Sequence, residues 1–355
     1  MRILAITNDF PPKPGGIQQY LSSLVQALPA EVRVLAPRDE GVDPGVGRGE
    51  RTFMWPTPGV RRWVQEEMAG FSPDVILFGA PHPLAWMGPR LREETGVPYA
   101  VLCHGAEVTI PAAFPVTRQL LRRPLVRADA VFAVSRYTLE RVQRLTRRPV
   151  RYVGGGVDAA FTPGVPPLGP PVVGCVSRFV PRKGQRRVLE AAARLRAEGR
   201  DLSVLLVGTG RDEQALRRAA DRLGVPTRFE VGVPWERLPG LYREMSVFAM
   251  PCRSRWFGLE IEGLGLVFLE AAASGLPVLA GDSGGSPETV VPGVTGFVAA
   301  RTGAVAEGLR LLLDAPDTTR EMGAAGRGRV RTDFTWEAVA ARFMEGLEAV
   351  TTGGV

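Results

Sequence analysis

The feature that most constrains the fold is an alternation of short apolar runs with longer amphipathic stretches, which repeats along both halves of the 355-residue chain. Runs that are apolar at nearly every residue are typical of parallel strands, and the stretches between them are typical of the helices that cover such a sheet. In the first half we expect strands at 2–7, 31–36, 74–79, 98–103, 129–134 and 150–153, and helices at 17–28, 60–69, 83–95, 116–127 and 136–146. In the second half we expect strands at 172–177, 202–207, 227–231, 246–250, 277–280 and 295–298, and helices at 184–198, 211–223, 235–244, 266–274, 302–313 and 335–349. The pattern predicts an α/β protein of two doubly wound parallel-sheet domains.

A stretch dense in proline and glycine separates the two halves. We expect an N-terminal domain over 1–155, a linker over 156–171 and a C-terminal domain over 172–334. Ligands of open α/β sheets bind beyond the carboxyl ends of the strands. With two such domains facing each other, the expected site is the cleft between them.

The charge balance points to an anionic partner. The formal net charge is +7, which favours nucleic acid, a phosphorylated ligand or an acidic membrane surface. Only two of the 44 basic residues are lysines, Lys13 and Lys183, and both lie in glycine loops between an expected strand and helix. The three scattered cysteines indicate a reducing compartment. No apolar run reaches the length of a membrane span, so we expect a cytoplasmic protein, peripheral at most.

Two of these loops carry residues suited to an anion. After the first expected strand, Gly15 and Gly16 precede a helix, where exposed backbone N–H groups favour negative charge. After the first strand of the second half, Arg178 and Lys183 flank a similar turn, and a diphosphate suits both a guanidinium fork and an ammonium. On its own, the first loop is equally compatible with an ordinary turn, and an exposed arginine or lysine such as those of the second loop is usually only a solvated charge.

A third motif is a pair of carboxylates eight residues apart, Glu262 and Glu270. A helix would separate them by about 12 Å, which is too far for the acid and nucleophile of a retaining glycosidase. The spacing suits two hydroxyl-bearing rings at either end of a diphosphate. Gly263 and Gly265 would begin a helix near 266 and offer N–H groups to the phosphates between the rings.

Two further loops belong to the same pattern. The run Gly284-Gly285-Ser286-Pro287-Glu288 follows a strand, with Ser286 the expected N-cap of a helix that begins at Pro287. His104 follows a strand end directly, and its position favours a functional role, whereas the prolines around His82 favour a structural one. The sequence has no metal-ligand pair of histidines, cysteines or aspartates at the usual spacing, no Walker pattern and no complete dinucleotide fingerprint.

Together these pieces resemble the retaining GT-B glycosyltransferases of family GT4, over essentially the whole chain. The ordered motifs that carry the resemblance are Gly15-Gly16, His104-Gly105, Gly156-Val157-Asp158, Arg178 with Lys183, Glu262 with Glu270, and Gly284-Gly285-x-Pro287-Glu288. Within the family, Val180–Gly184 and Cys252-Arg253 look most like the actinobacterial phosphatidylinositol mannosyltransferases. The resemblance implies two facing Rossmann-like domains, with the last helix, 335–349, returning to the first.

The resemblance also implies a nucleotide-sugar donor, held mainly by the C-terminal domain, and no metal or other cofactor. Arg178 and Lys183 would bind the diphosphate, Glu270 the ribose and backbone near Val231 the base. Glu262 and the backbone of Gly263, Leu264, Gly265, Leu266 and Val267 would hold the sugar and the phosphates. Gly16 would close on the phosphate, and His104 would bind the donor sugar near the reacting carbon.

The implied reaction is transfer of a hexose, with GDP-mannose the expected donor, and with retained anomeric configuration. We expect a phosphatidylinositol-mannoside-type acceptor at the inner face of the plasma membrane. A basic and apolar stretch over 114–127, which includes Arg118, and another near Arg62 suit an anionic lipid surface, and Asp9 is a further acceptor candidate. A solvated helix explains 114–127 equally well, and Pro124 should kink or end it.

Other readings remain. A family GT4 enzyme with a UDP-, ADP- or GDP-sugar and a soluble acceptor, such as a sugar phosphate or a natural product, is the main alternative. A catalytically inactive sugar-nucleotide sensor is disfavoured, because every expected donor residue is present. A nucleic-acid-binding protein would explain the charge but leave the glycine loops unused. The sequence does not determine the oligomeric state.

Overall fold

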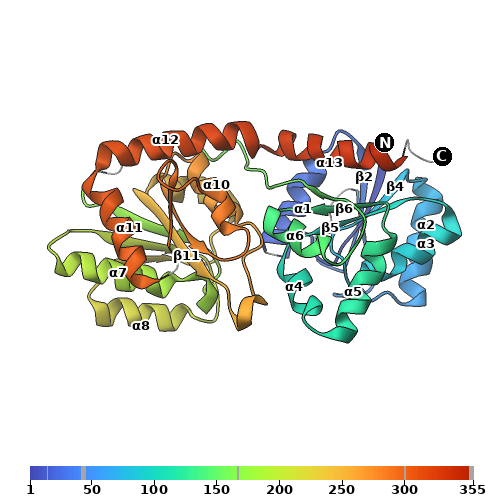
Figure 1. Ribbon diagram of the computed structural model, residues 1–355, viewed down its shortest axis with the longest axis horizontal. Coiled ribbons are helices and arrows are strands. Elements are labelled where there is room, and N and C mark those ends of the chain that lie inside the picture. The colour runs from blue at the N-terminus through green and yellow to red at the C-terminus, as the bar shows by residue number, and fades with distance from the viewer. Residues whose placement is uncertain (14, 41–44, 166–167, 300, 352–355) are drawn as a thin grey trace. The chain divides into compact units, whose positions relative to one another are not determined.

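The computed structural model describes residues 1–13, 15–40, 45–165, 168–299 and 301–351 (Figure 1). The chain divides into two units, one comprising Met1–Gly156 with the chain from Trp336 onward, and the other Val157–Thr335. The described residues of the expected linker lie in the second unit, apart from Gly156, and residues 166–167 lie outside the described part.

The first unit is built on a seven-stranded parallel sheet in the order β3-β2-β1-β4-β5-β6-β7. The strands are β1 (Arg2–Ile6), β2 (Glu31–Ala36), β3 (Val46–Arg48), β4 (Val75–Phe78), β5 (Tyr99–Cys103), β6 (Ala130–Ala133) and β7 (Val150–Tyr152). The strand order reverses between β1 and β4, which is where sheets of this type place ligands at the carboxyl edge.

Helices cover both faces of this sheet. They are α1 (Gly16–Ala27), α2 (Pro58–Phe71), α3 (Gly88–Thr95), α4 (Ala106–Ala112), α5 (Pro115–Arg127), α6 (Arg136–Gln143) and α13 (Trp336–Thr351). One face forms a continuous apolar core with α2, α3, α5 and α6, for example through Phe78, Val101 and Leu125. The other face carries α13, whose Phe343 stacks on Phe132 of β6 at 4.2 Å between ring centroids.

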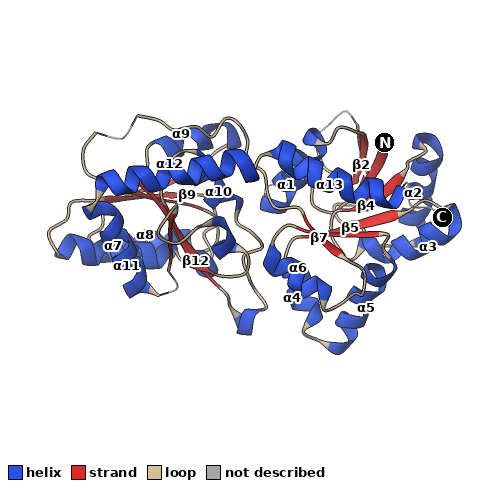
Figure 2. Cartoon of the chain, turned by 45° about the horizontal axis from the view of Figure 1, so that its top comes forward, coloured by secondary structure: helices blue, strands red, loops and turns tan. Residues whose placement is uncertain are grey.

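The second unit contains a six-stranded parallel sheet in the order β10-β9-β8-β11-β12-β13. Its strands are β8 (Val172–Val176), β9 (Ser203–Val207), β10 (Thr227–Glu230), β11 (Val247–Arg253), β12 (Val278–Asp282) and β13 (Gly296–Val298). Its helices are α7 (Gln185–Ala197), α8 (Glu213–Leu223), α9 (Leu238–Arg243), α10 (Leu266–Ala273), α11 (Thr302–Asp314) and α12 (Pro316–Asp333). Figure 2 shows these helices on both sides of the strands. Both units are therefore doubly wound parallel sheets, as the sequence predicts.

Some local expectations were wrong. β3, α4 and α12 were not foreseen. Helix α5 continues through Pro124 to Arg127, so this proline does not end it; its carbonyl accepts a hydrogen bond from the Tyr99 hydroxyl at 2.7 Å. Ser286 is not an N-cap. It is the first residue of a 3-10 turn, Ser286–Thr289, and its buried hydroxyl lies 2.6 Å from the Gly281 carbonyl and 2.8 Å from that of Ser283.

Candidate functional site in the second unit and the carboxyl edge of the first

The loop after β8 is fixed by a glycine. A 3-10 turn, Pro181–Lys183, ends at Gly184, which has a φ of +84°. A Cβ at this position would lie 2.3 Å from the carbonyl oxygen of Pro251, so the close approach to β11 admits only glycine. This packing holds Lys183, whose side chain is buried, at the carboxyl edge of the sheet.

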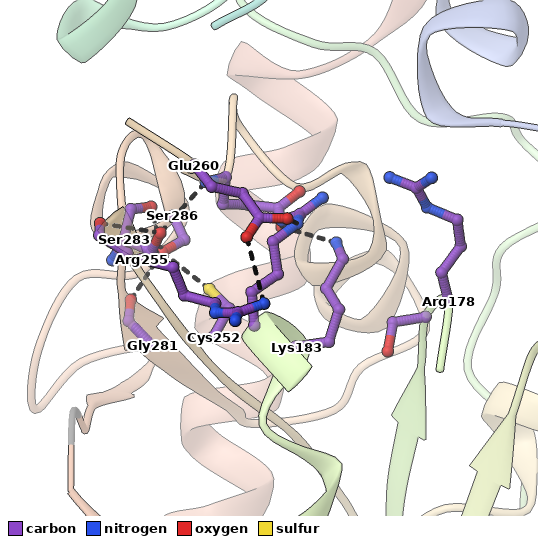
Figure 3. A network of polar contacts seen from close by, with 12 residues as sticks. Arg178, Lys183, Cys252, Arg255, Glu260, Gly281, Ser283 and Ser286 are labelled. Carbon is purple, nitrogen blue, oxygen red and sulfur yellow. Dashed lines mark hydrogen bonds and ion pairs between the residues drawn. The ribbon is translucent and has the colours of Figure 1, made fainter. Parts of the chain in front are cut away.

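Lys183 belongs to a buried ion-pair network (Figure 3). The Lys183 ammonium and the Arg182 guanidinium both donate to Oε2 of Glu262, at 2.6 and 2.7 Å. Arg182 also lies 3.6 Å from Glu260, whose other carboxylate oxygen lies 3.5 Å from Arg255. Three cations and two carboxylates thus alternate beside the start of α10.

Glu262 is held ionised by this network. Burial alone would raise the pKa of its carboxyl, and it is the largest single influence. The charges and hydrogen bonds of Lys183 and Arg182 together outweigh it and lower the pKa to about 2. Among the described residues, Oε1 of Glu262 has no hydrogen-bond partner, so it is available as an acceptor.

The loop after β12 fixes the backbone of Glu262. Its N–H donates to the Ser283 hydroxyl at 3.1 Å, and its carbonyl accepts from the Gly285 N–H at 3.0 Å. Gly284 has a φ of +57°, and a Cβ there would lie 2.0 Å from the Glu262 carbonyl oxygen. The two glycines of this loop therefore serve to position Glu262.

Arg178 lies in the loop after β8 but outside the network. In Figure 3 its side chain carries no dashed contact. The residue is exposed, and within the described part of the chain its guanidinium has no hydrogen-bond or ion-pair partner. Arg178 is thus a cation without a counter-ion among the described residues, in the same loop as a lysine that already has one.

The pKa of Glu270, on α10, is shifted in the opposite direction to that of Glu262. Burial raises the pKa of its carboxyl to about 7, although a hydrogen bond of 2.8 Å from the Tyr242 hydroxyl of α9 partly opposes this. No cation contacts it among the described residues. Glu270 is therefore partly protonated near neutral pH.

The remaining predicted residues of this unit lie around α10 and β10. Gly265 is the N-cap of α10, at a φ of +89°, so the N–H groups of the first turn lie close behind Glu262, as expected. Glu262 itself precedes the helix and Glu270 lies within it, in agreement with the expected helix start near 266. Val231 follows β10 and is 42% exposed.

A strained loop joins β11 to Glu262. Trp256, Phe257 and Gly258 have consecutive φ values of 49°, 55° and 86°, in a region that bulky side chains seldom adopt. Arg255 and Glu260 close the loop through two backbone hydrogen bonds of 2.9 and 3.3 Å. Both aromatic side chains are exposed, Phe257 completely.

In the first unit, His104 follows β5 and is buried. Its Nε2 lies 3.0 Å from the Gly79 carbonyl. The Tyr20 ring packs edge-on against the imidazole, with 5.3 Å between the two ring centroids. Burial lowers the pKa of the imidazole, against the opposing effects of Glu107, the Gly79 hydrogen bond and Asp9. Because a carbonyl only accepts, Nε2 carries the proton in the neutral ring, and Nδ1 is an acceptor.

Gly16, the first residue of α1, has open space where a Cβ would stand, and its φ is not positive. Nothing in the described chain therefore requires glycine at this position. Asp9, in the loop before α1, accepts a hydrogen bond from Gln18 at 2.6 Å and contributes to the electrostatics of His104. The structure thus brings Asp9, Gln18 and His104 together at the carboxyl edge.

The other acceptor candidates are not part of this cluster. Arg62 on α2 and Arg118 on α5 are exposed. No described contact joins either of them to Asp9 or to the other.

Sequence reasoning missed several partners in both clusters. Arg182 and Glu260 had usable signals, since one precedes Lys183 and the other lies two residues before Glu262. Glu107 lies three residues after His104 and accepts from its backbone N–H, a spacing typical of a helix start. Gln18 and Tyr242 gave no signal of their own.

Comparison with known proteins identifies the family. The family model for Glycosyltransferase Family 4 matches residues 14–161, and that for Glycosyl transferases group 1 matches residues 158–329. The chain is 38% identical, over 97% of both chains, to the GDP-mannose-dependent alpha-(1-6)-phosphatidylinositol monomannoside mannosyltransferase of Mycolicibacterium smegmatis. It is 36% identical, over 98% of both, to the GDP-mannose-dependent monoacylated alpha-(1-6)-phosphatidylinositol monomannoside mannosyltransferase of Corynebacterium glutamicum. The chain is a family 4 glycosyltransferase.

Solved structures agree with this fold assignment. The glycosyltransferase superposes on the sucrose-phosphate synthase of Thermosynechococcus elongatus with a TM-score of 0.84 at 21% identity, covering both chains completely. It superposes on Anabaena HepE in complex with UDP-glucose with a TM-score of 0.81 at 20% identity, covering 98% of this chain and all of HepE. These likenesses concern the fold.

Among the described residues of the glycosyltransferase, no group of three or more His, Cys, Asp or Glu side chains is arranged to hold a metal ion. Within the same residues, no helix has the length and apolar content needed to cross a bilayer. The chemistry that the described site offers is cationic and hydrogen-bonding: Arg178, Lys183 and Arg182, with two buried glutamates of opposite pKa shift.

Proposed function

We propose that this glycosyltransferase moves mannose from GDP-mannose to a phosphatidylinositol-mannoside-type lipid at the inner face of the plasma membrane. The observation that carries the choice of donor and acceptor is the full-length similarity to enzymes named for that donor and that acceptor class. The site in the second unit supports the donor half of the proposal independently, through its cations.

The donor diphosphate would bind Arg178 and Lys183. Arg178 is exposed and without a counter-ion among the described residues, which suits an incoming anion. The N–H groups at the start of α10, from Gly263 to Val267, add favourable partial charge next to these cations. A diphosphate placed here would meet its opposite charge without a metal ion.

The two glutamates would contact hydroxyl groups at either end of the diphosphate. Glu262 offers Oε1 to the sugar while Oε2 remains bound to Arg182. Glu270 would accept from the ribose hydroxyls, and donation from them would favour its ionised form. Backbone near Val231 would meet the base.

Gly16 and His104 have roles toward the donor that rest on the family resemblance. The open space at Gly16 suits a close approach of phosphate to its N–H. The unprotonated Nδ1 of His104 suits a hydrogen bond from a sugar hydroxyl. Substitution of each residue tests these roles separately.

For the reaction, we propose front-face transfer with retained configuration. The acceptor hydroxyl oxygen forms a bond to the anomeric carbon as the bond from that carbon to the diphosphate breaks. The acceptor proton passes to the departing diphosphate oxygen. Arg178 and Lys183 would stabilise the charge that develops on this leaving group.

The acceptor side is supported by surface chemistry. On α5, the exposed apolar side chains of Val116, Leu120 and Val126 alternate with exposed arginines that include Arg118. A face of this kind suits an anionic lipid surface. Asp9 and Arg62 remain candidates for contacts with the acceptor headgroup.

Calorimetric titration without metal against GDP, UDP and ADP tests the donor, followed by a transfer assay with GDP-mannose and a phosphatidylinositol mannoside. Preferential binding of GDP and transfer to the lipid are expected. Preference for UDP or ADP would instead favour the alternative of a soluble acceptor. Binding of none would refute the proposed donor site.

A further inference from the structure

An arginine-lined pocket lies on the first unit, away from the edge that carries His104. Its volume is about 580 Å³. It is lined by α5, by the last residue of α6 and by the segment between α6 and β7, namely Arg122, Val126, Gln143, Arg144, Leu145, Thr146, Arg147 and Arg148. That segment precedes β7, whereas His104 follows β5. In a parallel sheet these positions lie at opposite edges, so the pocket is separate from the carboxyl-edge cluster.

The charge of this pocket is uncompensated. Four of its eight lining residues are arginines, and none is acidic. Arg144, Arg147 and Arg148 are exposed and have no ion-pair partner among the described residues. Two nearby acids bind other arginines, Glu93 with Arg127 at 2.8 Å and Asp129 with Arg92 at 3.2 Å.

The wall that carries these arginines is held in place by side-chain hydrogen bonds. Gln143 donates to the carbonyls of Thr146 and Arg148, at 3.2 and 3.0 Å, and accepts from the Val150 N–H at 3.1 Å. The buried Thr146 hydroxyl donates to the Leu125 carbonyl of α5 at 3.2 Å. Arg122 donates through Nε to the Leu145 carbonyl at 3.1 Å, which joins α5 to this segment. Like charges that repel one another are thus held together by a fixed backbone.

We propose that this pocket binds a phosphate-bearing anion, either a soluble phosphate compound or a phospholipid headgroup. Guanidinium groups recognise phosphate oxygens through paired N–H donors, and an anion would relieve the repulsion among the four arginines. The exposed Val126 at the rim is compatible with both sources. The proposal does not depend on the identity of the donor or the acceptor.

The test compares R147A/R148A with R218A/R222A, a control that removes two exposed arginines from α8 of the second unit. Inorganic diphosphate is titrated at low ionic strength with the donor site saturated by GDP. Association is then measured with vesicles of phosphatidylcholine alone and with added phosphatidylinositol. A third variant, R147K/R148K, keeps the charge but loses the guanidinium forks.

If the pocket takes a soluble anion, R147A/R148A weakens diphosphate binding by about tenfold, the control does not, and the lysine variant recovers it only in part. If it takes a headgroup, the same variant instead loses most of its association with phosphatidylinositol vesicles. Unchanged behaviour with both probes, at an unchanged Tm, would overturn the proposal. Failure of GDP to bind would refute the donor proposal alone, because the pocket lies in the other unit.

Discussion

The ammonium of Lys183 donates to Oε2 of Glu262 at 2.6 Å, although 79 residues separate the two in the sequence. A diphosphate that binds Lys183 must therefore compete with a buried carboxylate. Arg182 donates to the same oxygen, so Glu262 keeps one cation when Lys183 turns to a ligand. The second cation makes that exchange possible without leaving a buried charge unpaired.

This arrangement separates the effects of two neighbouring substitutions. Lys183→Ala and Arg182→Ala each remove one partner of Glu262, so both should lower the free energy of unfolding by about 1–3 kcal/mol. Of the two, only Lys183→Ala should reduce turnover on the order of 100-fold, because Lys183, unlike Arg182, is assigned to the leaving diphosphate. Denaturant unfolding and initial rates measure both effects. Equal losses of turnover would contradict the assignment.

Glu270 predicts a pH-dependent stability. Its pKa rises on folding from 4.5 to about 7, so ionisation of this carboxyl opposes the folded state. The protonated carboxyl therefore contributes stability that is fully present below about pH 4.5. This contribution is lost as the pH rises through 7. Glu270→Gln removes this titration. Relative to the parent, the variant should gain up to about 2–3 kcal/mol between pH 5 and pH 8. Thermal unfolding of the parent and the variant at pH 5 and pH 8 tests this. An equal change in stability between the two pH values for both proteins would disprove the prediction.

Two glycine substitutions should behave differently. Gly284→Ala forces a Cβ to within 2.0 Å of the Glu262 carbonyl oxygen at a positive φ, so it should cost about 2 kcal/mol or more. Gly16→Ala adds a Cβ in open space and should leave Tm unchanged while weakening donor binding. Scanning calorimetry and GDP titration distinguish the two. Unaltered donor binding in Gly16→Ala would remove Gly16 from the site.

The aromatic loop offers a test of backbone strain. Phe257 is fully exposed at a φ of 55°, so Phe257→Gly should relieve about 1 kcal/mol and raise Tm by a few degrees. Phe257→Ala is the matched control, since it removes the ring but keeps the Cβ that causes the strain. A similar Tm for both variants would show that the left-handed backbone is not the cause.

The sequence predicted the order of most strands and helices because most strands of both sheets are short, apolar and buried. It missed β3, whose residues Val46–Arg48 form a half-buried edge with no apolar run. It missed α12 because Gly323 and Gly326 resemble loop residues. Gly323 in fact allows close packing, since a Cβ there would lie 2.0 Å from the Gly275 carbonyl oxygen.

The site was predicted as a set of motifs rather than as a network. Lys183, Glu262 and Glu270 were identified from their local context. The bond from Arg182 to Glu262 spans 80 residues and depends on how β8, β11 and β12 are ordered in the sheet. The opposite pKa shifts of the two glutamates were also hidden, because they follow from which cations fold against each carboxylate.

The return of the chain to the first unit determines how the two units can be expressed separately. The Val157 N–H donates to the Phe334 carbonyl at 2.9 Å, so the second unit begins and ends at adjacent points, as an inserted domain does. Gly156 lies against Trp336 in the first unit, so its two segments also meet. Residues 157–335 are therefore suited to expression as one continuous piece. A short peptide linker from residue 156 to residue 336 would join the two segments of the first unit. Truncation of the chain after residue 156 would instead remove α13, and with it the packing of Phe343 against the sheet.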